Sequence, residues 1–263
     1  MDALERDKRR FGFRFTAGGV HTARTMMLSE LDRLIAWVDN PAAATRDYFE
    51  AVETHNCLGK RSGKTRHLTV RHLRSLYGLD PSLTLFRNLL FFWDRDPSAR
   101  PLIALACACG RDPILRSSIP FIGSHGPGEP VRREDLEAFI EALNPGRFSK
   151  ATLKSTAQNL NSTWTQSGHL AGKANKVRSR AGATPGAAAY ALLLGYLSGG
   201  RGESLFLTDF AGLLDCGVDR RMELAEAASR KGWMVFKRAG DVVEALFPQR
   251  LTEAETEWIR EQH

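Results

Sequence analysis

The chain has 263 residues, of which 43% are hydrophobic and 25% charged, and it carries a net charge of +7. Enough apolar residues are present to bury a core, which excludes an intrinsically disordered protein. The longest apolar runs, residues 101–109 and 187–197, fall short of the roughly 20 residues that a membrane span needs, which excludes a transmembrane protein.

The N-terminus is predicted to be an arm, residues 1–15, in which Phe11, Phe13 and Phe15 alternate with small or charged residues. This period is typical of a half-buried strand, and it fits equally well an extended segment that lies on a helix. The first ten residues, MDALERDKRR, lack the apolar stretch of a signal peptide.

Five helices are predicted between the arm and residue 118. Apolar residues at helical spacing place them at residues 20–38, 42–55, 64–77, 82–93 and 101–109. Asn40-Pro41 ends the first of them, because proline cannot continue a helix. The last is apolar all round, which predicts a central buried helix with Cys107 and Cys109 in the core.

The third of these helices is entered through a glycine-containing basic loop, residues 59–63. On a helical wheel its wet face is entirely basic, and Arg66 lies near the apolar side. The basic sector holds Lys64, His67, Arg71 and Arg74, and the opposite sector holds Val70, Leu73, Leu76 and Tyr77. A merely solvated face is the alternative interpretation.

Residues 119–130, IPFIGSHGPGEP, are rich in Gly and Pro and predict a domain boundary. Beyond it we expect a helix over 131–143, a turn, a helix over 149–166 and a basic hairpin over 168–182. This order is typical of a winged helix-turn-helix. A plain helical hairpin with a solvated loop is the alternative.

The same order recurs after residue 183. We expect a helix over 185–197, a short strand at 204–206, helices over 208–215 and 219–231, and a hairpin of 233–237 and 242–246. The helix over 219–231 mixes acidic and basic residues, so we assign this unit to protein contact or to the core. Thr252 and Glu255 predict a capping box that begins a terminal helix.

The expected fold class is therefore mainly α, with a helical N-terminal domain followed by winged helix-turn-helix-like units with short β-hairpins. The expected parts are an N-terminal arm (1–15), a helical domain with a basic loop and helix (16–118), a winged-helix-like DNA-binding unit (131–183), a second such unit (184–247) and a C-terminal helix (248–263).

Positive charge is gathered into two stretches that contain no Asp or Glu, residues 54–79 and 142–202. They hold fourteen Lys and Arg residues, and because the chain nets only +7, everything outside them sums to −7. Neutralising phosphates is a common use of such focused charge. We expect duplex DNA to contact Lys60, Arg61, Lys64, Arg66, Arg71, Arg74, Lys150, Lys154, Gln158, Asn161, Lys173, Lys176, Arg178 and Arg180, with the two amides placed to reach base edges.

The sequence offers little for catalysis. Gly63-Lys64-Thr65 matches the end of a phosphate-binding loop, but Leu58 stands where that motif needs glycine and a helical pattern precedes it instead of a strand. No metal-ligand spacing, disulfide framework or paired-carboxylate cluster occurs around the four cysteines or elsewhere. We expect a cytoplasmic protein with reduced thiols that is not an enzyme and that uses no metal and no cofactor.

The run His55-Asn56-Cys57-Leu58-Gly59-Lys60-Arg61-Ser62, with Thr65 and the basic helix after it, resembles the BrxA family. Thr16-Ala17-Gly18-Gly19 extends the match upstream. That family is an accessory component of bacterial BREX (bacteriophage exclusion) defence systems. The resemblance implies a non-enzymatic DNA-binding protein that works beside other components of such a system. The second winged-helix-like unit departs from the family pattern, which puts the usual partners in doubt.

These observations favour a double-stranded DNA-binding accessory protein of an anti-phage system. An interaction scaffold that docks an acidic protein, or a winged-helix transcriptional regulator, is the alternative. Nucleotide binding at Gly63-Lys64-Thr65 is a remote third hypothesis. An RNA target stays open, because the charge argument does not distinguish the two sugars, and the oligomeric state is not predicted.

Overall fold

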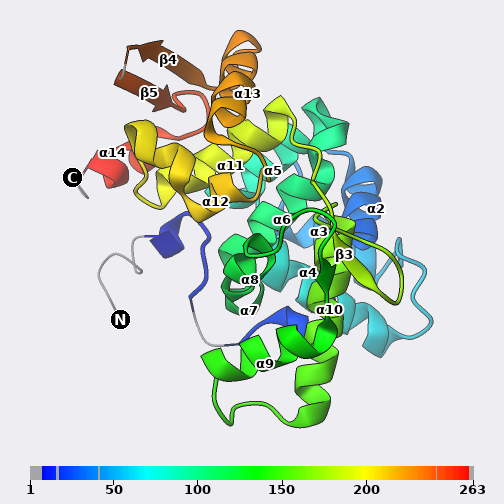
Figure 1. Cartoon of the computed structure of the whole chain (residues 1–263). Coiled ribbons are helices and arrows are strands. Elements are labelled where there is room, and N and C mark those ends of the chain that lie inside the picture. Colours follow the sequence, from blue (N-terminus) through cyan, green and yellow to red (C-terminus); the bar gives the residue numbers. More distant parts are fainter. Residues whose placement is uncertain (1–7, 16–17, 41, 241, 261–263) are drawn as a thin grey trace.

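The structure, a computed structural model, describes residues 8–15, 18–40, 42–240 and 242–260. Within these ranges it is mainly helical with two small antiparallel sheets (Figure 1), which confirms the predicted fold class. The α-helices are α2 (Leu28–Val38), α3 (Thr45–Glu53), α4 (Gly63–Tyr77), α5 (Thr84–Arg95), α6 (Arg100–Arg111), α7 (Pro113–Ser117), α8 (Ile119–Gly123), α9 (Arg133–Leu143), α10 (Lys150–Gln166), α11 (Pro185–Leu197), α12 (Asp209–Gly212), α13 (Val218–Arg230) and α14 (Glu253–Arg260).

Three short 3₁₀ helices, five strands and a helical segment at residues 8–10 complete the described part of the chain. The 3₁₀ helices are η1 (Val20–Thr22), η2 (Pro97–Ala99) and η3 (Gly202–Leu207). One sheet has the strand order β1-β3-β2 and consists of β1 (Pro130–Val131), β2 (Leu170–Ala171) and β3 (Lys176–Arg178). The other pairs β4 (Val235–Ala239) with β5 (Val242–Leu246). None of the helices in the described ranges combines the length and hydropathy that crossing a bilayer requires.

Parts of several predictions lie outside the described residues. These are residues 1–7 of the arm, Thr16 and Ala17 of the family motif, Pro41 at the predicted helix stop, Asp241 in the second hairpin and residues 261–263 of the terminal helix.

Helices α6 and α11 occupy the centre of the molecule and pack against each other and against α5 (Figure 1). Every residue of α6 from Leu102 to Gly110 is buried, which confirms the predicted central helix and the core positions of Cys107 and Cys109. Tyr190 of α11 donates a hydrogen bond of 3.0 Å to the carbonyl of Leu85. The front and back parts of the chain are thus held by one shared core.

The buried hydrophobic residues form a cluster that runs from Phe11 to Ile259. It crosses the predicted boundary at 119–130, which begins with α8, where Phe121 and Ile122 are buried. The parts named from the sequence are therefore regions that pack on a common core.

The described part of the N-terminal segment, residues 8–15, forms no strand and follows the extended alternative only in part. Phe11 and Phe13 are buried, but their backbone pairs with helix ends rather than with a strand. Arg14 donates to the carbonyl of Gly110 at 3.1 Å, and the amide of Leu85 donates to Phe11 at 3.1 Å. Residues 8–10 are helical and residues 11–12 form a turn, so the extended part that lies across the helices is residues 13–15.

The helix predicted over 20–38 is wrong in its first half. Residues 20–22 form η1, and α2 begins only at Leu28, after Met27 in the left-handed region at φ 54°. The strand predicted at 204–206 is also wrong, because these residues belong to η3. The helices predicted over 42–55, 64–77, 82–93, 131–143 and 149–166, both hairpins and the Thr252–Glu255 capping box are present, with shifted ends.

Candidate nucleic-acid interface

The basic loop before α4 is closed by Asn56, which adopts φ 49°. Its side-chain oxygen accepts from the amide of Lys60 at 2.7 Å, and its side-chain nitrogen donates to the carbonyl of the same residue at 3.1 Å. Ser62 then caps α4 by accepting from the amide of Thr65 at 3.2 Å. These hydrogen bonds fix the backbone of the loop and of the first turn of α4.

The wet face of α4 is exposed and basic, as its pattern predicts. Arg61, Lys64, Arg71 and Arg74 are exposed, and none of them has a carboxylate partner among the described residues. The Arg74 guanidinium lies 5.5 Å from the centroid of the Phe49 ring. This face keeps its positive charge available to an outside partner.

Three cationic side chains near this face are already engaged or partly buried. Lys60 pairs with Glu30 at 3.0 Å, and His67 lies 2.7 Å from a carboxylate oxygen of Glu53. Arg66 is half-buried, as its place near the apolar side predicts. These residues contribute less free charge than the exposed ones.

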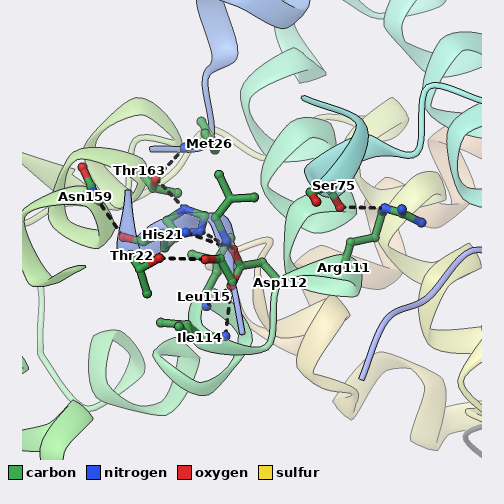
Figure 2. A network of polar contacts seen from close by, with 12 residues as sticks. His21, Thr22, Met26, Ser75, Arg111, Asp112, Ile114, Leu115, Asn159 and Thr163 are labelled. Atoms are coloured by element: carbon green, nitrogen blue, oxygen red, sulfur yellow. Dashed lines mark hydrogen bonds and ion pairs between the residues drawn. The ribbon is translucent and has the colours of Figure 1, made fainter. Parts of the chain in front are cut away.

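The segment 19–28 lies between α4 and α10 and is hydrogen-bonded to both (Figures 1 and 2). The Tyr77 hydroxyl of α4 donates to the carbonyl of Met26. From α10, Asn159 donates to the carbonyl of His21 at 3.0 Å, and the Thr163 hydroxyl accepts from the amide of Met26 at 2.9 Å. This segment brings the two predicted DNA-contacting helices close together.

A buried carboxylate organises the start of this segment (Figure 2). Asp112 accepts from the amide of Val20 at 2.6 Å and from His21 Nδ1 at 2.8 Å, and it also accepts from the first amides of α7. A Cβ atom at Gly19 would lie 2.3 Å from the same carboxylate, so only glycine fits there. This binding of backbone amides holds residues 20–22 in a 3₁₀ turn instead of an α-helix.

The lowered pKa of Asp112 supports that role, because an ionised carboxylate is the stronger acceptor of hydrogen bonds. Burial raises its pKa, but the neighbouring His21 ring and the hydrogen bonds it accepts lower the pKa below the usual 3.8 overall. His21 Nε2 lies 2.9 Å from the Thr163 hydroxyl. The three side chains have the spacing of an acid–base–hydroxyl relay, but each is at most 1% exposed and Thr163 is occupied by the Met26 amide. The network is structural.

One residue outside the predicted set, Arg24, belongs to this surface. Arg24 is exposed on the bridging segment, residues 19–28. Burial lowers the pKa of His72 most, and the charges of Arg24 and Arg71 lower it further, so both arginines lie near that ring. The signal was present in the sequence, since no carboxylate occurs between Asp7 and Glu30. This third acid-free stretch was missed because it is shorter than the other two.

Helix α10 presents part of its predicted polar face. Ser149 caps it by accepting from the amide of Thr152 at 3.2 Å, and Lys150, Lys154 and Gln158 are exposed. Asn161 is a wrong prediction, because it is only 5% exposed and lies on the side of the helix that faces the core. Gln158 is then the amide of this pair that can reach a base edge.

The hairpin after α10 is present, and Lys173, Arg180 and, in part, Lys176 are exposed. The Lys176 ammonium donates to the carbonyl of Gly172 at 2.6 Å. Arg178 is a wrong prediction. It is 8% exposed and forms a bidentate pair with Asp215, at 2.5 and 2.9 Å, so it cannot contact a phosphate.

Most of the predicted cations stay free of internal carboxylates. Of the fourteen Lys and Arg residues in the two acid-free stretches, Lys60 and Arg178 are the two that form ion pairs within the described ranges. Helix α13 of the second unit behaves differently, because Arg220 pairs with Glu223 at 2.7 Å and Arg230 with Glu226 at 3.0 Å. Of helices α4, α10 and α13, the first two carry the exposed cations that have no carboxylate partner in the described ranges.

The phosphate-binding-loop hypothesis fails on its structural context. Gly63 begins α4, and the element before it is helix α3, not a strand. Residues 89–94, which imitate a magnesium-binding strand, lie inside α5. The helix start at Gly63-Lys64-Thr65 fits the motif, but the missing upstream strand and Leu58 in place of the first glycine do not.

No known family model matches the chain, and no curated protein matches it either. The likeness to the BrxA family therefore stays a prediction that rests on the loop residues described above.

Proposed function

We propose that this protein binds double-stranded DNA through the exposed cations of α4, the bridging segment and the α10 unit. The observation that carries the proposal is the contrast between these cations, which lack carboxylate partners in the described ranges, and the paired cations of α13. Free cations release the counterions of the DNA backbone when they bind phosphates, and this release drives association. The contacting residues are Arg24, Arg61, Lys64, Arg71, Arg74, Lys150, Lys154, Gln158, Lys173, Lys176 and Arg180.

A charge-reversal pair of variants tests the proposal. The triple variant Arg61→Glu, Lys64→Glu and Arg71→Glu removes three exposed cations from α4, and we expect duplex affinity in a mobility-shift assay to fall roughly 100-fold or more. The matched control, Arg220→Glu, Arg230→Glu and Lys237→Glu, changes the net charge equally on the second unit and should change affinity less than threefold. An equal loss of duplex affinity in both variants would show that affinity depends on net charge alone, and it would contradict the proposed interface.

Salt dependence measures the size of the contact. If about six phosphates are neutralised, the affinity should fall with salt with a log–log slope near −5. Competition among duplex DNA, single-stranded DNA and RNA across the same salt range identifies the preferred nucleic acid. Gln158→Ala should alter sequence preference, and equal binding to all duplexes by the wild-type protein would make the contact one of backbone readout alone.

The resemblance to the BrxA family supports a role for this binding in a BREX-type anti-phage system. In this proposal the protein is a cytoplasmic, non-enzymatic accessory factor, and other components of that system are its further partners. The second function, an interaction scaffold for an acidic protein, uses the same free cations. Titration with random duplex at physiological salt separates the two, because a scaffold would bind the duplex weakly or not at all.

A further inference from the structure

A cavity of about 800 Å³ lies between α2, α5 and residues 249–252, apart from the proposed DNA interface. Its size is within the usual range for sites that bind small molecules. Apolar and aromatic side chains line much of it, among them Ile35, Tyr48, Leu90, Phe91 and Leu251. Four arginines also line it, which is unusual for a mostly apolar cavity.

Two of these arginines, Arg95 and Arg250, contact one aromatic ring, that of Phe91. Arg87, Phe91 and Arg95 follow one another at intervals of four residues along α5, so they form a single stripe on the helix. Arg250 reaches the same ring from the segment before α14. The guanidinium of Arg250 lies 3.5 Å from the Phe91 centroid and that of Arg95 lies 3.9 Å from it. Because one face of a ring cannot hold two guanidiniums this close, the two arginines cover opposite faces.

Four carboxylates, those of Asp32, Asp39, Asp94 and Glu255, lie at or beside the cavity, but only two of the four arginines are held in close ion pairs. Arg87 is held by Glu255 at 2.7 Å, and Arg100 by Asp32 at 2.9 Å. Arg95 has only a loose contact of 3.7 Å with Asp94, whose side chain is 85% exposed.

Arg250 is the least compensated of the four. It has no carboxylate partner within the described ranges, and its Nε atom is buried without a hydrogen-bond partner. Burial, and then the charges of Arg95 and Arg87, lower its pKa. Like charges this close repel one another unless an anion lies between them.

The opposite wall supplies hydrogen-bond acceptors. Asp39 at the end of α2 lines the cavity and is exposed there, while the neighbouring Asp32 is occupied by Arg100. A ligand that spans the cavity therefore meets guanidiniums on one side and a free carboxylate on the other. A molecule with a phosphate at one end and hydroxyl groups at the other satisfies both sides.

We propose that this cavity binds a small phosphorylated molecule that carries hydroxyl groups, such as a nucleotide or a sugar phosphate. Its phosphate accepts hydrogen bonds from Arg95 and Arg250 at the edge of the Phe91 ring, and its organic part lies against Leu90 and Ile35. The inference does not rest on DNA binding, because the cavity and the DNA interface share no residues.

Calorimetric titration of the full chain with AMP, ribose 5-phosphate, inorganic phosphate and adenosine tests the proposal. We expect AMP or ribose 5-phosphate to bind in the micromolar range, and inorganic phosphate and adenosine to bind at least about tenfold more weakly. Better binding of AMP identifies a nucleotide, and better binding of ribose 5-phosphate identifies a sugar phosphate. Binding of adenosine as tight as that of AMP, or of no probe at all, would overturn the proposal.

Two variants locate the site. Arg95→Gln and Arg250→Gln should each weaken binding about tenfold or more, because each removes a charge-assisted hydrogen bond to the phosphate. Arg95 is 45% exposed, so its variant should fold even where that of Arg250 does not. Arg230→Gln, an exposed arginine of α13, is the matched control and should leave the affinity unchanged.

The α4 triple variant distinguishes this site from the DNA interface. It should keep its AMP affinity while it loses duplex binding, and the Arg95 variant should do the reverse. Loss of AMP binding in the α4 variant would assign the ligand to the basic surface and overturn the cavity as its site.

Discussion

The two helix-and-hairpin units share an order of elements but differ in how they use charge. In the first, α10 exposes Lys150, Lys154 and Gln158 with no acid beside them. In the second, α13 pairs its two exposed arginines, Arg220 and Arg230, with glutamates three or four residues away, and these pairs neutralise that charge. Equal topology therefore does not imply equal function, because the partner is selected by unpaired surface charge.

The two hairpins also differ, in how firmly each is held to the rest of the protein. The β4–β5 hairpin is largely exposed and carries the cross-strand pair Lys237–Glu244 at 3.5 Å. The β2–β3 hairpin is anchored, since Arg178 reaches across to Asp215, a residue of the second unit. Burial raises the pKa of Asp215, but its hydrogen bonds with Arg178 and the amide of Ala181 lower it further than burial raises it. One arginine thus holds the first hairpin in place and leaves its neighbours free to bind.

The largest expected effect is on that anchor. Arg178→Ala leaves the Asp215 carboxylate without its partner and should lower the free energy of unfolding by about 3–5 kcal/mol, measured by urea denaturation. Arg180→Ala, two residues away and exposed, should change it by less than about 0.5 kcal/mol. Similar values for the two variants would show that the Arg178–Asp215 pair does not anchor the first hairpin.

The first unit should also confer a pH dependence that the second lacks. Burial lowers the pKa of His169 from its ordinary 6.5 to about 4, and its Nε2 donates to the carbonyl of Leu213 at 3.1 Å. Between these two pH values His169 binds a proton in the unfolded chain but not in the folded protein. The free energy of unfolding therefore falls as the pH falls. At pH 5 the loss relative to pH 7 should be about 2 kcal/mol.

The measurement is urea denaturation at several pH values. His169→Gln should remove most of this slope between pH 7 and pH 4, while the control His55→Gln, an exposed histidine, should keep it. A slope that survives in His169→Gln would assign the pH dependence to other groups.

The charge difference between the units predicts different contributions to DNA binding. The double variant Lys150→Ala and Lys154→Ala should weaken duplex binding about tenfold and reduce the log–log salt slope by about 2, one for each lost phosphate contact. Arg220→Ala with Arg230→Ala should leave both quantities unchanged, because these arginines are already paired. A loss with the second pair would mean that both units touch the duplex.

The smallest expected effects concern the helix caps. Ser149→Ala removes the side-chain cap of α10 and should cost about 1 kcal/mol of stability. Helix α13 begins after Gly217, which has no side chain to act as a cap, so Gly217→Ser should gain a few tenths of a kcal/mol. Thermal unfolding of the two variants checks both signs, and a loss in the second would show that the position needs glycine for another reason.

Local patterns were sufficient for much of the fold. The basic helix at 64–77, the buried helix at 101–109 and the Thr252–Glu255 capping box are all recognised from residues within one or two turns of each other. The exposed cations of α4 were predictable for the same reason, because a helix with one apolar side has only one way to face a core.

Four errors came from partners that are distant in the chain. Val20 and His21 have a helical pattern, but Asp112 binds their amides and holds them in a 3₁₀ turn. The sequence predicts Arg178 to be one more free cation of the hairpin, but Asp215 lies beside it and pairs with it. Asn161 and the segment 204–206 likewise depend on which neighbours pack against them.

The sequence by itself determined the helical fold class, the buried faces of the helices and the concentration of positive charge, because each follows from residues close together in the chain. Only the tertiary structure decided which of those charges are free, where α4 and α10 lie relative to each other, and that Arg95 and Arg250 meet at Phe91. The physical reason is that ion pairs and cavities are made between segments whose separation in sequence carries no record of their distance in space.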